Sequence, residues 1–405
     1  MRKKEKSDAG RRDDKLKKKI LIIDDSALMR RVLCDIINSD DRFEVAEYAV
    51  DGADGFKKVC AKTYDAVVLD VYMPKMTGLE LLKEMQKSKV YASVLMASTT
   101  TGEGAKETIE ALELGAVDFI KKPENVADAR HVEFRDRFLT LLDVVSKTNP
   151  SHMARAGLSG TGTGARTFVS RYDVNFHNKP GTIPTSNTLR AGDVKAAGKP
   201  VEPARNKQYP KVPGKKIVAI ASSTGGPKAL QEVIPKLPGD LNAPVLLVQH
   251  MPKGFTGSLA SRLNELSYID VTEAKEGEPL LKGHVYIAPG GAHLNAVRAA
   301  GGNKIHLSDE PAREGVKPCA NYMYESLVGA NFDEVVCVVL TGMGCDGTAG
   351  IVNLKKSQKV RVIAQNEESC TVYGMPRSIV DGGLADEVVP LSEVADHIIK
   401  NVGVC

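Results

Sequence analysis

The chain has 405 residues, of which 42% are hydrophobic and only 5% aromatic, a composition typical of soluble α/β proteins with two or three domains. No apolar run approaches the roughly 18 residues that a membrane-spanning helix needs. The charged N-terminal residues also lack the apolar middle of a secretory signal. We therefore expect a cytoplasmic protein that is not inserted in a membrane.

Positive charge is concentrated at the N-terminus. The first 19 residues carry a net charge of +6 by themselves, against +4 for the whole chain. Residues 1–17 read as a disordered basic tail, which could contact nucleic acid or an anionic surface but is more often a solvated arm. Because the remainder is slightly negative, we expect no nucleic-acid partner.

The seven cysteines are odd in number, scattered, and without a C-x-x-C spacing. Neither a disulfide framework nor a zinc site is indicated. We expect reduced thiols that lie mostly in the core.

Two α/β patterns are separated by a segment of different character. Apolar runs alternate with helix-like stretches up to about residue 140, which predicts a parallel sheet with crossover helices. Residues 146–214 are rich in Gly, Pro, Ser, Thr and Lys without apolar periodicity, as in a long flexible linker. A second alternation occupies residues 215–402 and predicts another α/β domain, mostly parallel, with strands at IVAIA, APVLLVQ, HVYIAPG, KIHLSD, EVVCVVL and VRVIAQ.

Carboxylates follow two strands of the first domain. Asp24 and Asp25 end the first strand and Asp70 ends the third. A single Asp at a strand end is usually a helix cap or turn former. Three of them at the edge where parallel strands end would instead suit Mg²⁺, and Ser98 and Lys122 end two further strands at the same edge. This set predicts a site for transfer of a phosphoryl group.

The ordered motifs DD, D-x-x-M-P-x-M-x-G-L, S and K-P make residues 18–140 resemble the receiver domain of bacterial two-component response regulators. The resemblance implies a doubly wound, flavodoxin-like fold that is phosphorylated by a histidine kinase. It also implies these roles: phosphate acceptor Asp70; Mg²⁺ ligands Asp24, Asp25, Asp70 and the backbone carbonyl of Tyr72; phosphate-binding Ser98 and Lys122; switch aromatic Phe119.

The second domain opens with IVAIASSTGGPKAL, residues 217–230. This segment matches neither a Walker loop, nor a dinucleotide loop, nor the G-x-S-x-G elbow of α/β-hydrolases. What remains is a strand, a bend at Ser223 and a helix that begins near Pro227. Taken alone, the segment favours a structural turn over a nucleophile, because Ser and Gly are ordinary turn residues.

Two further strand ends change that balance. His250 follows APVLLVQ, and Asp346 lies in TGMGCDGTAG after EVVCVVL. Singly, the histidine would be a packed or capping residue and the aspartate a helix N-cap. Together with Ser223 they would supply a nucleophile, a general base and a carboxylate that orients the base.

These motifs, with VQHMPKGFTGSLASRLN and IAQNEESCTVYGMP, make residues 215–402 resemble the catalytic domain of the chemotaxis protein-glutamate methylesterases, a family that joins this domain to a receiver through a linker. The resemblance implies a serine hydrolase that needs no cofactor for ester cleavage. It would act on glutamyl methyl esters, and on certain glutamines, of methyl-accepting chemotaxis receptors. It implies Ser223 as nucleophile, His250 as base and Asp346 as its orienting partner, with the backbone amides of Thr224 and Met343 as candidates for the oxyanion hole.

The chain departs from the family pattern in one segment. Where members commonly show R-P-S-V-D, residues 317–321 read Lys-Pro-Cys-Ala-Asn. The change from Arg to Lys loses planar, bidentate recognition of a carboxylate. Cys345, beside Asp346, has no motif of its own and is expected to be an ordinary thiol.

Three hypotheses remain open at this level. In the first, the unphosphorylated receiver packs over the Ser223 edge, so that removing residues 1 to about 210 raises activity. In the second, the protein is a DNA-binding response regulator with a compact helical output domain. In the third, the second domain keeps the hydrolase shape only to bind receptors.

Overall fold

The computed structural model describes residues 16–98, 102–123, 132–148 and 210–405. Most of the predicted basic tail and most of the predicted linker lie outside these ranges. No helix within them is long and apolar enough to cross a membrane.

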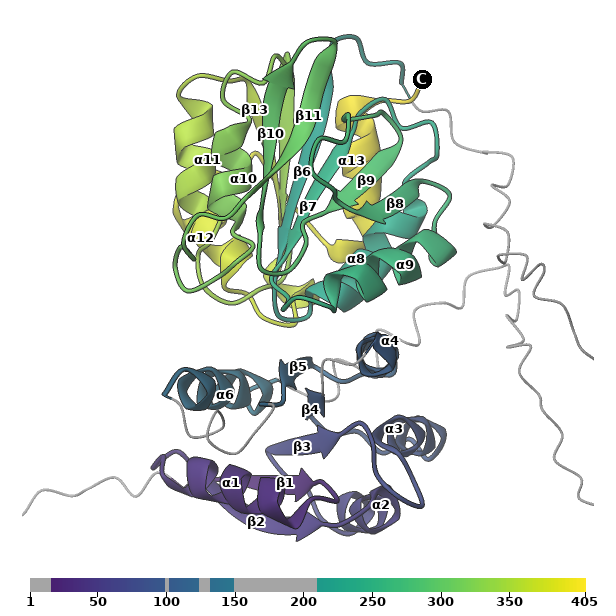
Figure 1. Cartoon of the computed structure of the whole chain (residues 1–405), viewed down its shortest axis with the longest axis vertical. Helices are drawn as coiled ribbons and strands as arrows, with labels where there is room; N and C mark the ends of the chain where they lie inside the picture. The colour runs from purple at the N-terminus through teal and green to yellow at the C-terminus, as the bar shows by residue number, and fades with distance from the viewer. Residues whose placement is uncertain (1–15, 99–101, 124–131, 149–209) are drawn as a thin grey trace, which may run out of the picture.

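The N-terminal domain is a five-stranded, fully parallel sheet in the order β2-β1-β3-β4-β5, flanked by helices (Figure 1). This is the doubly wound order of flavodoxin-like folds. The central strand β3 is AVVLD with every residue buried, as expected for a strand covered on both faces. Its elements are β1 (Lys18–Ile23), α1 (Ala27–Asn38), β2 (Phe43–Ala49), α2 (Gly52–Ala61), β3 (Ala66–Asp70), α3 (Gly78–Lys87), β4 (Val94–Ser98), α4 (Gly102–Glu113), β5 (Asp118–Lys121) and α6 (Val132–Val145).

The C-terminal domain is a seven-stranded parallel sheet in the order β14-β13-β12-β6-β7-β9-β8. The order reverses at β6, so its C-terminal end is a topological switch point, where α/β proteins place their sites. Its elements are β6 (Lys216–Ser222), α8 (Gly226–Val233), β7 (Val245–Gln249), α9 (Thr256–Leu266), β8 (Asp270–Glu273), β9 (His284–Ile287), β10 (His293–Ala299), β11 (Gly302–Ser308), α10 (Ala320–Ser326), β12 (Glu334–Val339), α11 (Thr348–Lys355), β13 (Val360–Gln365), α12 (Met375–Asp381), β14 (Glu387–Val389) and α13 (Val394–Val402), with short 3-10 turns at Ile234–Lys236, Glu367–Ser369 and Leu391–Glu393.

The predicted fold class is confirmed, with two differences in detail. The run KIHLSD does not join the parallel sheet, because β10 and β11 form a separate antiparallel hairpin. Its turn at Gly301 and Gly302 has positive φ angles of 89° and 142°, which glycine adopts without strain. The cysteines are free, as expected, but only Cys319 and Cys337 are buried, so the prediction that most lie in the core was wrong.

The two domains are in contact through α4 and β5 of the receiver-like domain and α8 and α9 of the other (Figure 1). The rings of Phe119 and Phe255 lie 4.5 Å apart, and both are buried. Arg262 of α9 donates to both carboxylate oxygens of Glu113 at 2.7 and 3.0 Å. This contact covers the C-terminal domain at the end where β6 leads into α8.

Candidate active site

The three predicted triad residues follow three neighbouring strands. Ser223 comes after β6, the middle strand, while His250 follows β7 and Asp346 follows β12 on its two sides. Because the strands are parallel, all three residues emerge at the same edge of the sheet. The sequence pattern alone predicted the three strand ends, and the sheet order makes them adjacent.

The two serines of the opening motif differ in their surroundings. Ser222 is the last residue of β6, fully buried, and its hydroxyl donates to Gln249 Oε1 at 2.7 Å. Ser223 is half-buried at the bend, and its carbonyl accepts from Gln249 Nε2 at 2.9 Å. The side chain of Gln249 therefore binds the hydroxyl of Ser222 and the backbone carbonyl of Ser223. Of the two hydroxyls, that of Ser223 is the one not held by Gln249.

His250 and Asp346 form a direct pair. The distance from His250 Nε2 to Asp346 Oδ2 is 2.7 Å, and both side chains are nearly buried. An ionised carboxylate can only accept, so Nε2 carries the proton and Nδ1 carries the lone pair. A base at His250 would therefore act through Nδ1, the reverse of the arrangement in chymotrypsin, where the carboxylate holds Nδ1.

Asp346 accepts hydrogen bonds from four donors. Besides His250, these are the amides of Ala320 at 2.6 Å and Asn321 at 2.9 Å, and the thiol of Cys319 at 3.1 Å. Burial would raise the pKa of Asp346, but the hydrogen bonds and charge of its partners hold it below the ordinary value. The carboxylate therefore stays ionised throughout the neutral range.

The backbone around Ser223 is closely packed. Gly225 begins α8 with φ +76°, and a Cβ there would lie 2.5 Å from Thr371. A Cβ on Gly342 would lie 2.8 Å from the Cβ of Ser223, so the segment before Met343 packs directly against the turn that carries Ser223. Within the described residues, neither the Thr224 nor the Met343 amide donates to a backbone acceptor. The predicted oxyanion-hole role requires amides without such a partner.

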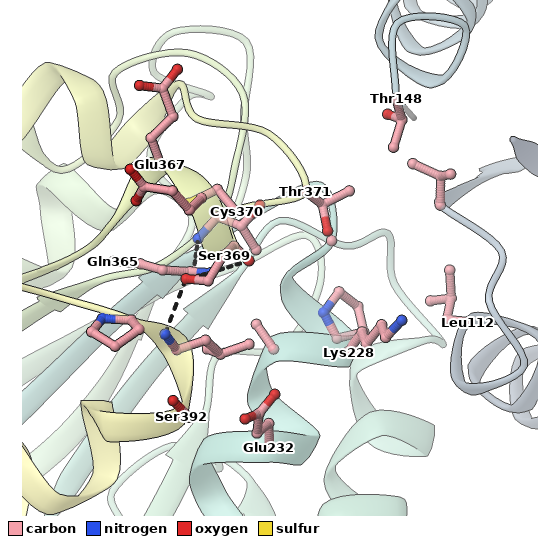
Figure 2. Close-up of a pocket in the computed structure, with 18 of the residues that line it drawn as sticks. Leu112, Thr148, Lys228, Glu232, Gln365, Glu367, Ser369, Cys370, Thr371 and Ser392 are labelled. Atoms are coloured by element: carbon pink, nitrogen blue, oxygen red, sulfur yellow. Dashed lines mark hydrogen bonds between the residues drawn. The ribbon is translucent and has the colours of Figure 1, made fainter. Parts of the chain in front are cut away.

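A cleft of about 820 Å³ opens between the two domains beside this turn. Figure 2 shows Leu112 and Thr148 on the receiver-like side, facing Lys228 and Thr371 on the catalytic side. Burial lowers the pKa of Lys228. At the same interface the Thr224 side chain hydrogen-bonds to Asp118 of β5, which places a carboxylate of the first domain next to the nucleophile turn.

The acidic cluster of the first domain lies at the predicted sheet edge. Carboxylate oxygens of Asp24, Asp25 and Asp70 lie within 4.8 Å of one another, and Lys122 Nζ lies 2.7 Å from both Asp24 Oδ2 and Asp70 Oδ2. Burial raises the pKa of Asp70 to about 6, against the opposing effect of Lys122 and with a further increase from Asp24. Three carboxylate donors around one ammonium match the oxygen ligands that a small divalent cation prefers.

The other three predicted receiver residues differ in their surroundings. The Ser98 hydroxyl is buried and contacts the Thr108 hydroxyl at 2.7 Å and the Gly104 carbonyl at 3.3 Å, both in α4. Phe119 is buried and its ring packs on Phe255 of the other domain. Tyr72 is a partly exposed residue just after β3.

Sequence reasoning missed the residues that support the triad. Gln249 stands directly before His250, but a glutamine at a strand end has no distinctive pattern. Asn321 lies in the departure from the family motif, and its side-chain oxygen accepts from the Gly347 and Gly350 amides at 3.0 and 2.7 Å, which fixes the loop that carries Asp346. That departure was the one signal pointing to this segment.

Comparisons with known proteins identify the family of both domains. The CheB methylesterase family matches residues 218–398, and the response regulator receiver domain matches residues 20–132. Two relatives named protein-glutamate methylesterase/protein-glutamine glutaminase, from Geobacillus kaustophilus and Bacillus subtilis, are 38% and 39% identical over 95% of this chain and 99% and 98% of their own lengths. The chain belongs to this methylesterase/glutaminase family.

Among solved structures, the catalytic domain of Thermotoga maritima CheB methylesterase is 41% identical. It covers 47% of this chain and all of that one, with a TM-score of 0.45. The match of residues 218–398 to the CheB methylesterase family and the seven-stranded parallel sheet show that the second domain is not the helical output that the DNA-binding hypothesis expected.

Proposed function

We propose that the protein hydrolyses glutamyl methyl esters, and deamidates particular glutamines, of methyl-accepting chemotaxis receptors in the cytoplasm. The observation that carries this proposal is the His250–Asp346 pair at 2.7 Å, on strand ends that flank Ser223. The relatives' names supply the substrate class.

In the first half-reaction the Ser223 hydroxyl attacks the ester carbonyl carbon while His250 Nδ1 takes its proton. The negative charge on the carbonyl oxygen is stabilised by the Thr224 and Met343 amides, and one such donor typically contributes about 3 kcal/mol to lowering the barrier. The tetrahedral intermediate then collapses, and the protonated His250 gives its proton to the departing methoxide. Methanol leaves an acyl-enzyme ester on Ser223.

In the second half-reaction a water attacks the acyl carbon and His250 takes its proton. Collapse expels Ser223, which is reprotonated by His250, and releases glutamate. A glutamine side chain would follow the same path with ammonia as the leaving group. Asp346 keeps the proton on Nε2 and stabilises the imidazolium in both halves.

The receiver-like domain would control access to this site. Phosphorylation of Asp70 by a histidine kinase adds about 1.5 to 2 negative charges. Asp24, Asp25, Asp70 and the Tyr72 carbonyl would hold Mg²⁺, which supplies neutralising charge for phosphoryl transfer. Lys122 and Ser98 would turn toward the phosphate, and the loss of the Ser98 contacts with α4 would loosen the face that carries Phe119 and Glu113.

The deciding experiment is methanol release from methylated receptor membranes. The wild-type chain should release methanol, and Ser223→Ala should reduce release to the membrane blank. Ser357→Ala removes an exposed hydroxyl after α11 and should behave as wild type. Equal release by wild type and Ser223→Ala would rule out the nucleophile assignment, whereas no release by either would favour the receptor-binding adaptor.

A further inference from the structure

Cys319 is placed against the catalytic carboxylate. It is fully buried just before α10, and its Sγ lies 3.1 Å from Asp346 Oδ1. Burial, with the nearby Asp346 charge, raises the pKa of the thiol to about 12. The sulfur is therefore protonated and acts as a donor to Asp346, on the carboxylate oxygen opposite to the one that meets His250.

A second buried residue fixes the direction of this thiol. The Cys319 amide donates to His293 Nδ1 at 3.1 Å, and His293 Nε2 lies 3.1 and 3.3 Å from the carbonyls of Glu310 and Pro311. His293 is fully buried, and burial lowers its pKa, so it is neutral with its proton on Nε2. The backbone of Cys319 is thus held from behind, with the thiol aimed at Asp346.

We propose that Cys319 is a positioning residue, whose thiol hydrogen bond fixes the Asp346 carboxylate and withdraws part of its negative charge from His250. This inference rests on the esterase function proposed above. A nucleophilic role for Cys319 is excluded by its complete burial and its protonation.

The chemistry gives the direction of the effect. An imidazolium at His250 is stabilised by whatever negative charge Asp346 retains, and each further donor to Asp346 reduces that charge. Removing the thiol should therefore keep the base protonated up to a higher pH. A hydroxyl in its place is a stronger donor and should have the opposite effect.

Other ionisable groups face the same carboxylate and must stay constant in the comparison. They are His250 from the loop after β7, Cys345 from the loop before α11 and Tyr324 from α10, while Arg313 faces the thiol itself. Substitutions at Cys319 leave all four in place.

The test is the pH dependence of kcat/KM for methanol release by the full chain carrying Cys, Ser or Ala at position 319. The midpoint of the acid limb should rise in the order Ser, Cys, Ala, with Cys319→Ala about 0.3 to 0.5 pH unit above wild type. Its plateau should fall about three- to tenfold, the loss of one hydrogen bond of ordinary strength, because a thiol is a weak donor. Cys319→Ser should keep at least the wild-type plateau.

Cys337→Ala is the matched control, because it removes an equally buried thiol from β12, the strand that leads to the Asp346 loop. It should lower stability without moving the acid limb. A common midpoint for all three residues at position 319 would overturn the inference, and if Cys319→Ala fails to fold, an unmoved midpoint in Cys319→Ser does so. If wild type releases no methanol above the Ser223→Ala blank, the proposed function fails instead.

Discussion

The two domains place aspartates at the same position in similar folds, with opposite electrostatic results. In the receiver domain, three carboxylates meet a single ammonium, and burial raises the pKa of Asp70 to about 6. In the catalytic domain, burial acts on Asp346 in the same direction, but four donors hold its pKa below the ordinary value. A buried carboxylate is easy to ionise only where the protein itself supplies its partners.

The receiver cluster therefore needs a cation or another external charge to balance its carboxylates, whereas the charge of Asp346 is balanced by groups of its own domain. The receiver cluster has excess negative charge that a cation and a phosphate would reorganise. The donors to Asp346 and the anchors of Ser223 all belong to the catalytic domain. We therefore expect phosphorylation to change access to the catalytic edge and not the chemistry carried out there.

The largest expected effect is on activation and involves the acidic cluster. Asp70→Asn, or removal of Mg²⁺ with a chelator, should abolish activation by beryllofluoride, a mimic of the acyl phosphate. The first change removes the carboxylate and the second removes the cation that the cluster needs to bind beryllofluoride. Basal methanol release should remain at the wild-type rate. Asp41→Asn, at a fully exposed carboxylate of the same domain, should keep normal activation.

If chelation lowered basal methanol release as well, catalysis itself would depend on the metal. The expectation that phosphorylation changes only access to the catalytic edge would then be wrong. Activation that survives in Asp70→Asn would remove Asp70 as the phosphate acceptor.

A smaller effect is expected from the ion pair that joins the domains. Arg262→Glu places a like charge opposite Glu113, so the interface should loosen and basal release should rise about three- to tenfold. The pair is partly exposed, which limits the effect through solvent screening. Glu113→Arg should act in the same way, and the double variant should return toward the wild-type rate.

Methanol release by the four proteins forms a double-mutant cycle. Arg377→Glu, which alters an exposed pair within α12, is the control for the charge change itself. If both single reversals leave basal release unchanged, the α4–α9 contact does not restrict access to Ser223.

The sequence could supply the strands and their terminal residues, because short apolar runs bounded by turn residues are local signals. It placed Ser223, His250 and Asp346 at separate strand ends, but it could not show that β12, β6 and β7 are neighbours. That adjacency depends on sheet order: β6 pairs on one side with β7, which follows it closely in the chain, and on the other with β12, more than 100 positions away.

The supporting contacts were beyond reach for the same reason. The donors at Cys319, Ala320 and Asn321 meet Asp346 where α10 packs against α11, more than 20 positions along the chain. The apolar run in KIHLSD does not reveal which strand it pairs with, and in the structure β11 pairs antiparallel with β10 across the glycine turn. The contact between Arg262 and Glu113 joins two ordinary surface charges whose relation only the docked domains reveal.

The smallest expected effect is a pH dependence of domain docking through Asp118. Burial raises the pKa of this carboxylate, while hydrogen bonds from Thr224 and the Phe119 amide and the charge of Arg137 on α6 act against the increase. On separation the carboxylate returns to water and to its ordinary pKa. Protonation therefore favours the docked form, and docking weakens as the pH rises through the raised pKa.

Basal release should thus gain an increment of about two- to threefold as the pH rises from the ordinary aspartate pKa through the raised one. Dividing the rate of each protein by the rate of Arg262→Glu at the same pH cancels the ionisations of the catalytic residues. The ratio for the wild-type protein should rise with pH. The ratio for Asp118→Asn, which keeps an acceptor for the Thr224 hydroxyl, should stay flat. A flat ratio in both proteins would mean that Asp118 keeps one protonation state whether the domains are docked or apart, and the receiver would then act on the catalytic edge by steric cover alone.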